Sequence, residues 1–169
     1  MAIFIFKEGV HFMKKDLDQE QAAYIIDVCA SANLRTVSGS LTQLYNHLLK
    51  PTGLKITQYY MLGNIYTSPD ISISKLGEIM LLDQTTVTRN LNILNDSGYV
   101  QIKRAEQDSR TKVVTITELG YEKLNDATPI WIRVQEEIEG SIGKAEYMDL
   151  LEKLDALQNV IDDFKSSST

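Results

Sequence analysis

The chain has 169 residues, of which 43% are hydrophobic and 24% are charged, a balance that fits one soluble globular domain with an extension. No apolar run approaches the roughly 18–20 residues that a membrane span needs, and the single cysteine, Cys29, excludes an intrachain disulfide. The only two histidines, His11 and His47, have no neighbouring metal ligands in the sequence, so neither a metal site, a cofactor nor an enzymatic activity is predicted.

The formal net charge of −6 is distributed unevenly along the chain. Residues 121–169 hold five basic and eleven acidic side chains, whereas residues 1–70 and 71–120 are each neutral overall. Within residues 84–117, five basic side chains stand against three acidic ones, a local balance of +2. Because salt screens charges beyond roughly 8–10 Å, we expect this local balance to decide how the segment meets a polyanion.

Residues 1–18 are interpreted as an N-terminal extension. The stretch KEGV can be encoded by a purine-rich ribosome-binding sequence, which raises the hypothesis that translation starts at Met13 and that residues 1–12 are a translated leader. A genuine short extension is the alternative. The hydrophobic stretch AIFIF is too short for a signal-peptide core, so a cytoplasmic protein is expected.

A long helix is predicted from about Gln19 to Lys50. Its apolar residues are spaced three and four apart and form one stripe: Leu34, Val37, Leu41, Leu44 and Leu48. Pro51 and Gly53 are expected to end it. A helix of this length favours packing against a partner chain.

Three shorter helices are predicted next, each preceded by a residue that can cap it. In order, they cover residues 58–67 after Thr57, 73–81 after Ser72, and 84–97 after Asp83. Gly98 is expected to end the third of them in the left-handed conformation.

Two strands, residues 99–104 and 112–117, are predicted to form a hairpin with a charged tip. Thr117 can cap a following helix from Glu118, in which Pro129 is expected to produce a kink. Gly140 and Gly143 are expected to separate this helix from a last amphipathic helix at residues 144–164.

This order of elements predicts a mainly α fold with a small antiparallel β-hairpin, a winged helix-turn-helix with long N- and C-terminal dimerisation helices. The winged helix-turn-helix is assigned to residues 54–120, and the dimerisation helices to residues 19–50 and 121–165.

The predicted helix at residues 84–97 has one apolar and one polar face. Val87, Leu91 and Leu94 fall within an arc of about 60° on a helical wheel and form its buried side. Its candidate DNA-reading residues are short and polar: Gln84, Thr85, Thr86, Thr88, Arg89 and Asn92. Such side chains suit the base edges of a major groove, and the helix start suits a phosphate. An ordinary solvated helix face is the alternative.

The predicted hairpin tip gathers cationic side chains. Its candidate DNA contacts are Arg104, Arg110 and Lys112, together with Asp108. Because Asp108 and Arg110 are two residues apart, they can lie on the same side of an extended segment, and Asp108 is expected to hold Arg110 in a fixed pose. An Arg in this place suits a narrow minor groove. A solvated charged turn is the alternative.

From Gly53 to Leu124 the chain resembles the MarR family of bacterial winged-helix transcription regulators. The matching stretches are GLKITQYYML, SISKLGEIMLLDQTTVTRNLNILNDSGYV and KRAEQDSRTKVVTITELG. With the long flanking helices, the resemblance covers about residues 20–165. Two positions depart from the family pattern. Ser109 stands where many relatives have a second Arg, and Lys75 stands where relatives often have Glu, so the capping box at Ser72 is absent.

The resemblance implies a homodimer in which the first and last helices of the two chains interdigitate. It also implies that this dimer binds double-stranded, palindromic operator DNA. It implies that residues 84–97 are the recognition helix and that Asp108 and Arg110 are the wing pair. By comparison with the peroxide-sensing branch of the family, Cys29 is a candidate redox sensor, with an inert half-buried thiol as the alternative.

The resemblance also implies that a small aromatic ligand can bind between the dimerisation helices and the DNA-binding lobe. The candidate lining residues are His47, Tyr59, Tyr60, Met61 and Trp131. Core packing is the alternative role for most of them. The function expected is a sequence-specific, dimeric DNA-binding regulator, a repressor released by a small-molecule or oxidative signal. The alternative is a ligand- or protein-binding dimeric module that has lost DNA binding.

Overall fold

The structure is a computed structural model that describes residues 18–106, 108 and 110–167. The chain divides into two compact units, residues 1–47 and 48–169, which are described separately. The hypothesis about Met13 concerns residues outside the described ones. Within the described part of the chain, none of the helices combines the length and the apolar character needed to cross a membrane.

The first unit contains α1 (Gln19–Val28) and most of α2 (Ala30–Leu48). The prediction of one continuous helix is wrong at Cys29, whose backbone is extended with a ψ of 113°. The side-chain amide of Asn33 donates hydrogen bonds to the carbonyl oxygens of Asp27 (2.8 Å) and Cys29 (3.0 Å). The asparagine side chain thereby satisfies carbonyl oxygens that an unbroken helix would bond to its own backbone N–H groups. The helix is interrupted at Cys29, and α2 begins at the next residue.

The apolar stripe of α2 lies at the surface of the chain. Its residues are between 38% and 56% exposed: Leu34, Val37, Leu41 and Leu44. After α2, a 3-10 turn (Lys50–Thr52) contains Pro51, and Gly53 adopts a left-handed φ of 76°. The predicted end of this helix is therefore confirmed.

The first α-helix that lies wholly in the second unit is α3 (Ile56–Thr67), which starts two residues before the predicted helix. Thr57 lies inside α3 and is not its cap. The cap position is Lys55, whose backbone N–H donates to the side-chain oxygen of Gln58 at 2.9 Å. Met61, Leu62 and Ile65 are completely buried and form the part of the core that α3 supplies.

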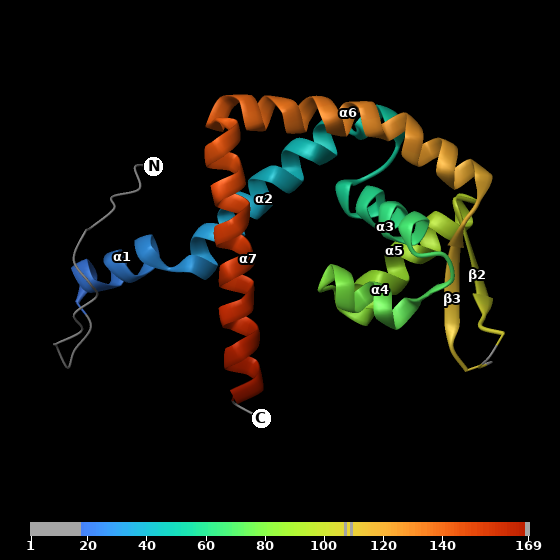
Figure 1. Cartoon of the computed structure of the whole chain (residues 1–169), viewed down its shortest axis with the longest axis horizontal. Coiled ribbons are helices and arrows are strands. Elements are labelled where there is room, and N and C mark those ends of the chain that lie inside the picture. The colour runs from blue at the N-terminus through green and yellow to red at the C-terminus, as the bar shows by residue number, and fades with distance from the viewer. Residues whose placement is uncertain (1–17, 107, 109, 168–169) are drawn as a thin grey trace. The chain divides into compact units, whose positions relative to one another are not determined.

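The helix-turn-helix is formed by α4 (Ile73–Met80) and α5 (Gln84–Asp96). The predicted cap at Ser72 is confirmed, since its hydroxyl accepts the backbone N–H of Lys75 at 3.1 Å. Gly77 packs against the turn and α5, because a Cβ at this position would lie 3.4 Å from both the Leu82 carbonyl oxygen and Val87 Cγ2. Figure 1 shows α3, α4 and α5 gathered beside the hairpin.

A three-stranded antiparallel sheet has the order β1-β3-β2, with β1 (Ile71–Ser72), β2 (Val100–Arg104) and β3 (Lys112–Ile116). The hairpin of β2 and β3 is confirmed, and Arg104 pairs directly with Lys112 at its outer end. The short β1 was not predicted. It pairs Ile71 with Val114, which joins the start of the helix-turn-helix to the hairpin.

The hairpin is closed at its base by Thr117. Its hydroxyl is 2.6 Å from the Gly98 carbonyl oxygen and also accepts the backbone N–H of Gly120, which makes Thr117 the cap of α6 (Glu118–Ile142) as predicted. Its backbone N–H donates to the carbonyl oxygen of Tyr99 at 3.0 Å. The start of α6 is thus held against the start of β2.

The last two helices, α6 and α7 (Lys144–Ser167), are separated at Gly143, whose φ is 101°. Gly140 was expected to contribute to the break but lies inside α6. Pro129 is also inside α6, where it removes one hydrogen-bond donor from the helical ladder. Across the break, the Gln135 side chain donates to the Tyr147 hydroxyl at 2.7 Å.

Candidate nucleic-acid interface

The start of α5 is fixed by the side chain of Asp83. One carboxylate oxygen accepts the backbone N–H of Thr86 at 2.8 Å, and the other accepts the Thr86 hydroxyl at 2.7 Å. These hydrogen bonds, led by that from the hydroxyl, lower the pKa of Asp83. Thr86 was predicted as a base reader, but here its hydroxyl is engaged in the cap and its side chain is half-buried.

The end of α5 is fixed by Gly98, which adopts the predicted left-handed φ of 75°. The backbone N–H of Gly98 donates to Asn95 O at 2.9 Å, and that of Tyr99 donates to Leu94 O at 2.9 Å. This is the Schellman arrangement, which satisfies carbonyls that the helix leaves open. With both ends held, α5 meets the winged-helix core as a rigid unit.

The buried side of α5 is the predicted one, since Val87, Leu91 and Leu94 are at most 1% exposed. The opposite side is exposed and polar, and it surrounds an open hollow of about 540 Å³. Its lining residues are Gln84, Thr85, Thr88, Arg89, Asn92, Ile93 and Asp96. Five of the six predicted readers therefore share one accessible face.

Two residues of α5 have positions that were not predicted from the sequence. Asn90 is buried and donates its side-chain amide to the Thr86 carbonyl oxygen at 2.9 Å. Ile93 is 47% exposed on the polar face, beside the predicted readers. Both roles can be predicted from a helical wheel. At 100° per residue, Asn90 lies about 60° from the buried Val87, and Ile93 lies about 40° from the exposed Arg89.

The outer end of the hairpin places two cations opposite each other. Arg104 and Lys112 are register partners on β2 and β3, and both are exposed. Like charges directly opposite on a sheet destabilise it. An anion that binds between or across the two side chains would relieve this repulsion.

Asp108 organises the backbone of the hairpin tip. Its carboxylate accepts the backbone N–H of Arg110 at 3.0 Å and the hydroxyl of Thr111 at 2.9 Å. These two hydrogen bonds, with that from Arg110 the larger cause, lower the pKa of Asp108. Asp108 thus holds Arg110, as expected, and does so through the backbone N–H of Arg110. Among the described residues Arg110 makes no side-chain ion pair, and its side chain is exposed.

The fourth cation of the hairpin is already paired. Lys103 Nζ lies 2.9 Å from Asp70 Oδ1, in the turn between α3 and β1. Asp70 raises the pKa of Lys103 through this hydrogen bond and through its charge. The local positive charge available to a polyanion is therefore supplied by Arg89, Arg104, Arg110 and Lys112.

Comparison with known proteins identifies the family. The model of the MarR family matches residues 52–111. The HTH-type transcriptional regulator SarZ of Staphylococcus epidermidis is 34% identical over 117 residues, which are 69% of this chain and 78% of SarZ. The chain belongs to the MarR family of winged helix-turn-helix regulators.

Other MarR-family relatives match over different shares of the chain. The organic hydroperoxide resistance transcriptional regulator of Bacillus subtilis is 30% identical over 83 residues, 49% of this chain and 56% of that protein. The crystal structure of the M. tuberculosis regulator MosR in complex with DNA has a TM-score of 0.67 and 30% identity, covering 78% of this chain and 98% of MosR. A MarR/EmrR-family regulator from Acinetobacter shares the fold, with a TM-score of 0.74.

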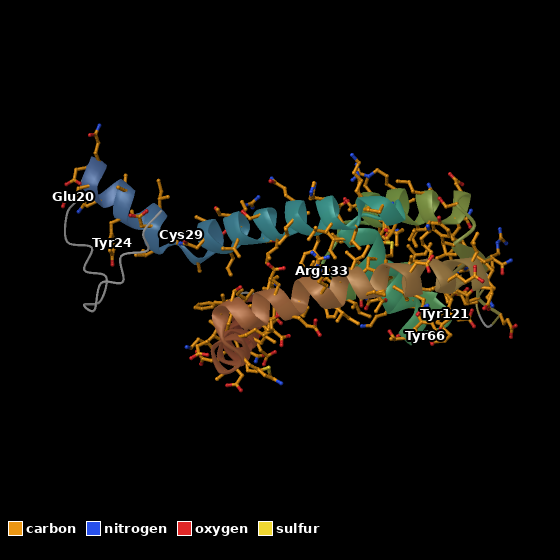
Figure 2. All side chains as sticks on the ribbon, turned by 90° about the horizontal axis from the view of Figure 1, so that it is seen from above. Glu20, Tyr24, Cys29, Tyr66, Tyr121 and Arg133 are labelled. Atoms are coloured by element: carbon orange, nitrogen blue, oxygen red, sulfur yellow. The ribbon has the colours of Figure 1, made fainter. Side chains whose placement is uncertain are left out.

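The candidate redox residue of this MarR-family chain lies at a helix junction. Figure 2 shows Cys29 between α1 and α2, and its side chain is half-buried. Its carbonyl oxygen accepts the backbone N–H of Asn33 at 3.0 Å, so Cys29 directly precedes the first turn of α2.

The candidate ligand residues separate into distinct environments. The ring of Tyr59 stacks on Trp131, with centroids 6.4 Å apart and planes at 20°, and it also contacts Tyr60 at 6.1 Å. Met61 is completely buried, so it belongs to the core rather than to a pocket wall. His47 is exposed and lies in the first unit. In the described part of the chain, acidic, histidine and cysteine side chains form no group suited to a metal ion.

Proposed function

We propose that the protein is a dimeric, sequence-specific regulator that binds double-stranded DNA and represses transcription until a small-molecule or oxidative signal releases it. The observation that carries this proposal is the exposed polar face of α5 together with the cation pair Arg104 and Lys112 on the adjacent hairpin. A polar helix face suits base edges in the major groove, and the hairpin cations suit phosphates.

The distribution of charge supports this orientation toward DNA. The helix face carries one cation, Arg89, so the hairpin supplies most of the attraction for the phosphates. The excess acid lies in residues 121–169, away in sequence from both elements. The MosR relative, whose structure contains DNA, further supports this mode of action.

A homodimer is supported by apolar faces that the single chain leaves exposed. Leu41 and Leu44 on α2, and Leu150, Leu151 and Leu154 on α7, are each more than a third exposed. Contiguous apolar surface of this kind marks an interaction site in a globular protein. Two-fold symmetry of the protein then requires an inverted repeat, with half-site centres about 10 base pairs apart or a multiple of it.

The oxidative arm of the signal is supported by Cys29 and by the relative from Bacillus subtilis, a regulator of organic hydroperoxide resistance. If Cys29 senses oxidants, peroxide weakens operator binding by the wild type and leaves a Cys29→Ser variant unchanged. Gel-shift titrations with and without peroxide, followed by thiol reductant, measure this. Equal affinities of the wild type under both conditions contradict the oxidative arm and leave DNA binding itself intact.

The rival function is a dimeric module that has lost DNA binding. Against it stand the exposed guanidinium groups of Arg89 and Arg110, which pair with no acidic side chain among the described residues. A chain released from DNA binding has no reason to keep two unpaired cations facing solvent beside a polar helix face.

The decisive experiment is a gel-shift titration on the promoter region of the protein's own gene. We expect wild-type binding to fall steeply as salt rises, because bound phosphates release counterions. Arg110→Ala should weaken binding to all sequences and lower the salt slope by about one, whereas Arg89→Ala should cost about 1–3 kcal/mol and relax one base position. Lys153→Ala, on α7 and paired with Asp149, is the control. Wild-type affinity in both arginine variants would show that these surfaces do not bind DNA.

A further inference from the structure

Ile93 differs in kind from its neighbours on the exposed face of α5. Among the residues that line the hollow of about 540 Å³, it is the only one whose side chain is wholly apolar. It is 47% exposed, and the other lining residues are polar or charged. Isolated apolar residues are common on protein surfaces, so a role for Ile93 has to follow from its position on this face.

Ile93 lies about one helical turn beyond Arg89. At 1.5 Å and 100° per residue, the two positions are about 6 Å apart along the helix axis and about 40° apart around it. Both side chains line the same hollow. A groove that receives the side chain of Arg89 therefore also receives that of Ile93.

The surroundings of Ile93 are unsuited to a phosphate group. Residues 90–96 contain no basic side chain, and Asp96, three residues after Ile93, also lines the hollow. A phosphate oxygen is bound by a cation or a hydrogen-bond donor. Ile93 offers neither, and a nearby carboxylate repels a phosphate. The contact left for Ile93 is with the base edges in the groove that Arg89 enters.

The base edges of the major groove carry one kind of apolar group. They present hydrogen-bond acceptors, amino donors and the C5-methyl group of thymine. An isoleucine placed over an acceptor or an amino group would remove its hydration without replacing the lost hydrogen bond, whereas contact with a methyl group buries apolar surface. We propose that Ile93 is a specificity-determining residue that contacts the C5-methyl group of a thymine in the operator.

The shape of the Ile93 side chain suits this contact. Branching at Cβ leaves one strongly preferred χ1 rotamer in a helix, so little side-chain freedom is lost when DNA binds. Thr85 and Thr88 also carry methyl groups, but each has a hydroxyl group that can bond the polar atoms of a base. Ile93 has no polar atom in its side chain and gains only from an apolar partner.

The place of the thymine follows from the geometry of the helix. Successive bases of one strand are about 3.4 Å apart along DNA, so the roughly 6 Å between Arg89 and Ile93 corresponds to about two base pairs. Arginine on the base edges contacts guanine most often. We therefore expect the thymine within about two base pairs of a guanine that Arg89 contacts, once in each half-site.

This inference rests on the proposed function, since it names a base that the recognition helix reads. The operator is first mapped by gel shift and footprinting on the promoter region of the protein's own gene. Each thymine of the half-site is then replaced in turn, in both half-sites, by deoxyuridine, which pairs with adenine in the same way and lacks only the methyl group. At one position the replacement should weaken wild-type binding about fifteenfold, as the loss of one methyl contact in each half-site predicts.

Protein variants assign the methyl contact to Ile93. The shortened side chain of Ile93→Ala no longer reaches the methyl group, so this variant should bind the thymine and deoxyuridine operators equally well. Ile93→Val keeps a branched apolar side chain and should retain most of the difference. Ile79→Ala on α4 is the matched control, because Ile79 is 48% exposed but does not line the hollow, and it should retain the whole difference.

The outcomes separate this inference from the proposed function. A deoxyuridine effect that Ile93→Ala removes and Ile79→Ala retains supports the thymine contact. Operator binding that no deoxyuridine replacement weakens, or an effect that persists in Ile93→Ala, refutes the contact alone and leaves the proposed function standing. A sensitive thymine far from the base position that Arg89→Ala relaxes also refutes it. A wild-type chain that binds no DNA refutes the proposed function, and the thymine contact with it.

Discussion

Gly120 lies where the first turn of α6 meets the backbone of Tyr99, just before β2. A Cβ at this position would be 1.9 Å from the Tyr99 carbonyl oxygen and 2.9 Å from Ile116 Cγ1. The first of these contacts is with backbone, which cannot rotate away as a flexible side chain does. The glycine is therefore required by a close approach rather than by an unusual φ.

We predict that Gly120→Ala lowers the free energy of unfolding by about 3 kcal/mol, because overpacking against backbone forces the helix start to move. Chemical denaturation of the two proteins measures the difference. Gly140→Ala, where a Cβ would have nothing within 4 Å, should be neutral or slightly stabilising. Equal stability of Gly120→Ala and the wild type would mean that α6 can leave the hairpin base at little cost.

Asp83 gives a pH-dependent prediction. Its pKa in the folded chain is lowered, so its stabilising effect is complete above the ordinary carboxyl pKa of about 3.9 and is lost as the pH falls through the folded value. Asp83→Ala should therefore lower the melting temperature at pH 7, and the deficit should shrink toward pH 3. Asp83→Asn keeps a capping oxygen without the charge and should show a smaller deficit. A deficit for Asp83→Ala that is the same at both pH values would contradict this role.

At the residue level, the sequence was a better guide to which side chains are buried or exposed than to which hydrogen bonds they make. The buried stripe of Val87, Leu91 and Leu94 follows from helical periodicity alone. The hydrogen bond from the Thr86 hydroxyl to Asp83 does not follow from periodicity, because a threonine in the first turn of a helix can face either the cap or the solvent. The contact of Asp108 with backbone depends in the same way on the turn geometry.

At the level of elements, caps and glycines allowed several bounds to be predicted. Ser72, Asp83 and Thr117 cap the helices that they were expected to cap, because each has a short polar side chain just before an amphipathic run. The break at Cys29 depends on the rotamer of Asn33, which sequence periodicity does not contain. The strand β1 exists only through its pairing with β3, more than 40 residues later.

The ion pair between Asp70 and Lys103 provides a test of the hairpin as an element. Asp70 has a φ of 58°, and asparagine tolerates this conformation, so Asp70→Asn should keep the turn while freeing Lys103. On the proposed function, we predict tighter DNA binding and a salt slope steeper by about one. Gel shifts at several salt concentrations measure it. Glu118→Gln removes the same charge without a partner on the hairpin, and an equal effect of the two variants would implicate net charge alone.

At the scale of the whole molecule, the proposed dimer gives the exposed apolar face of α2 a partner. We predict that Leu41→Glu weakens self-association at least roughly a hundredfold, because a carboxylate at an apolar interface is left without a counter-charge. Sedimentation velocity across a concentration series measures the dimer. Gln43→Glu adds the same charge outside the stripe and should leave the dimer unchanged. A wild-type chain that stays monomeric at all concentrations would contradict the proposed dimer.

The closure of the hairpin by Thr117 has a consequence for engineering. Gly98, Tyr99 and Gly120 meet Thr117 at one point, so the two ends of the hairpin are held together where they join the helices. Residues beyond that point, around the tip at Asp108, can be lengthened, shortened or exchanged for those of a related regulator as a cassette. Hairpin tips of different lengths can therefore be compared in chains whose helices are identical.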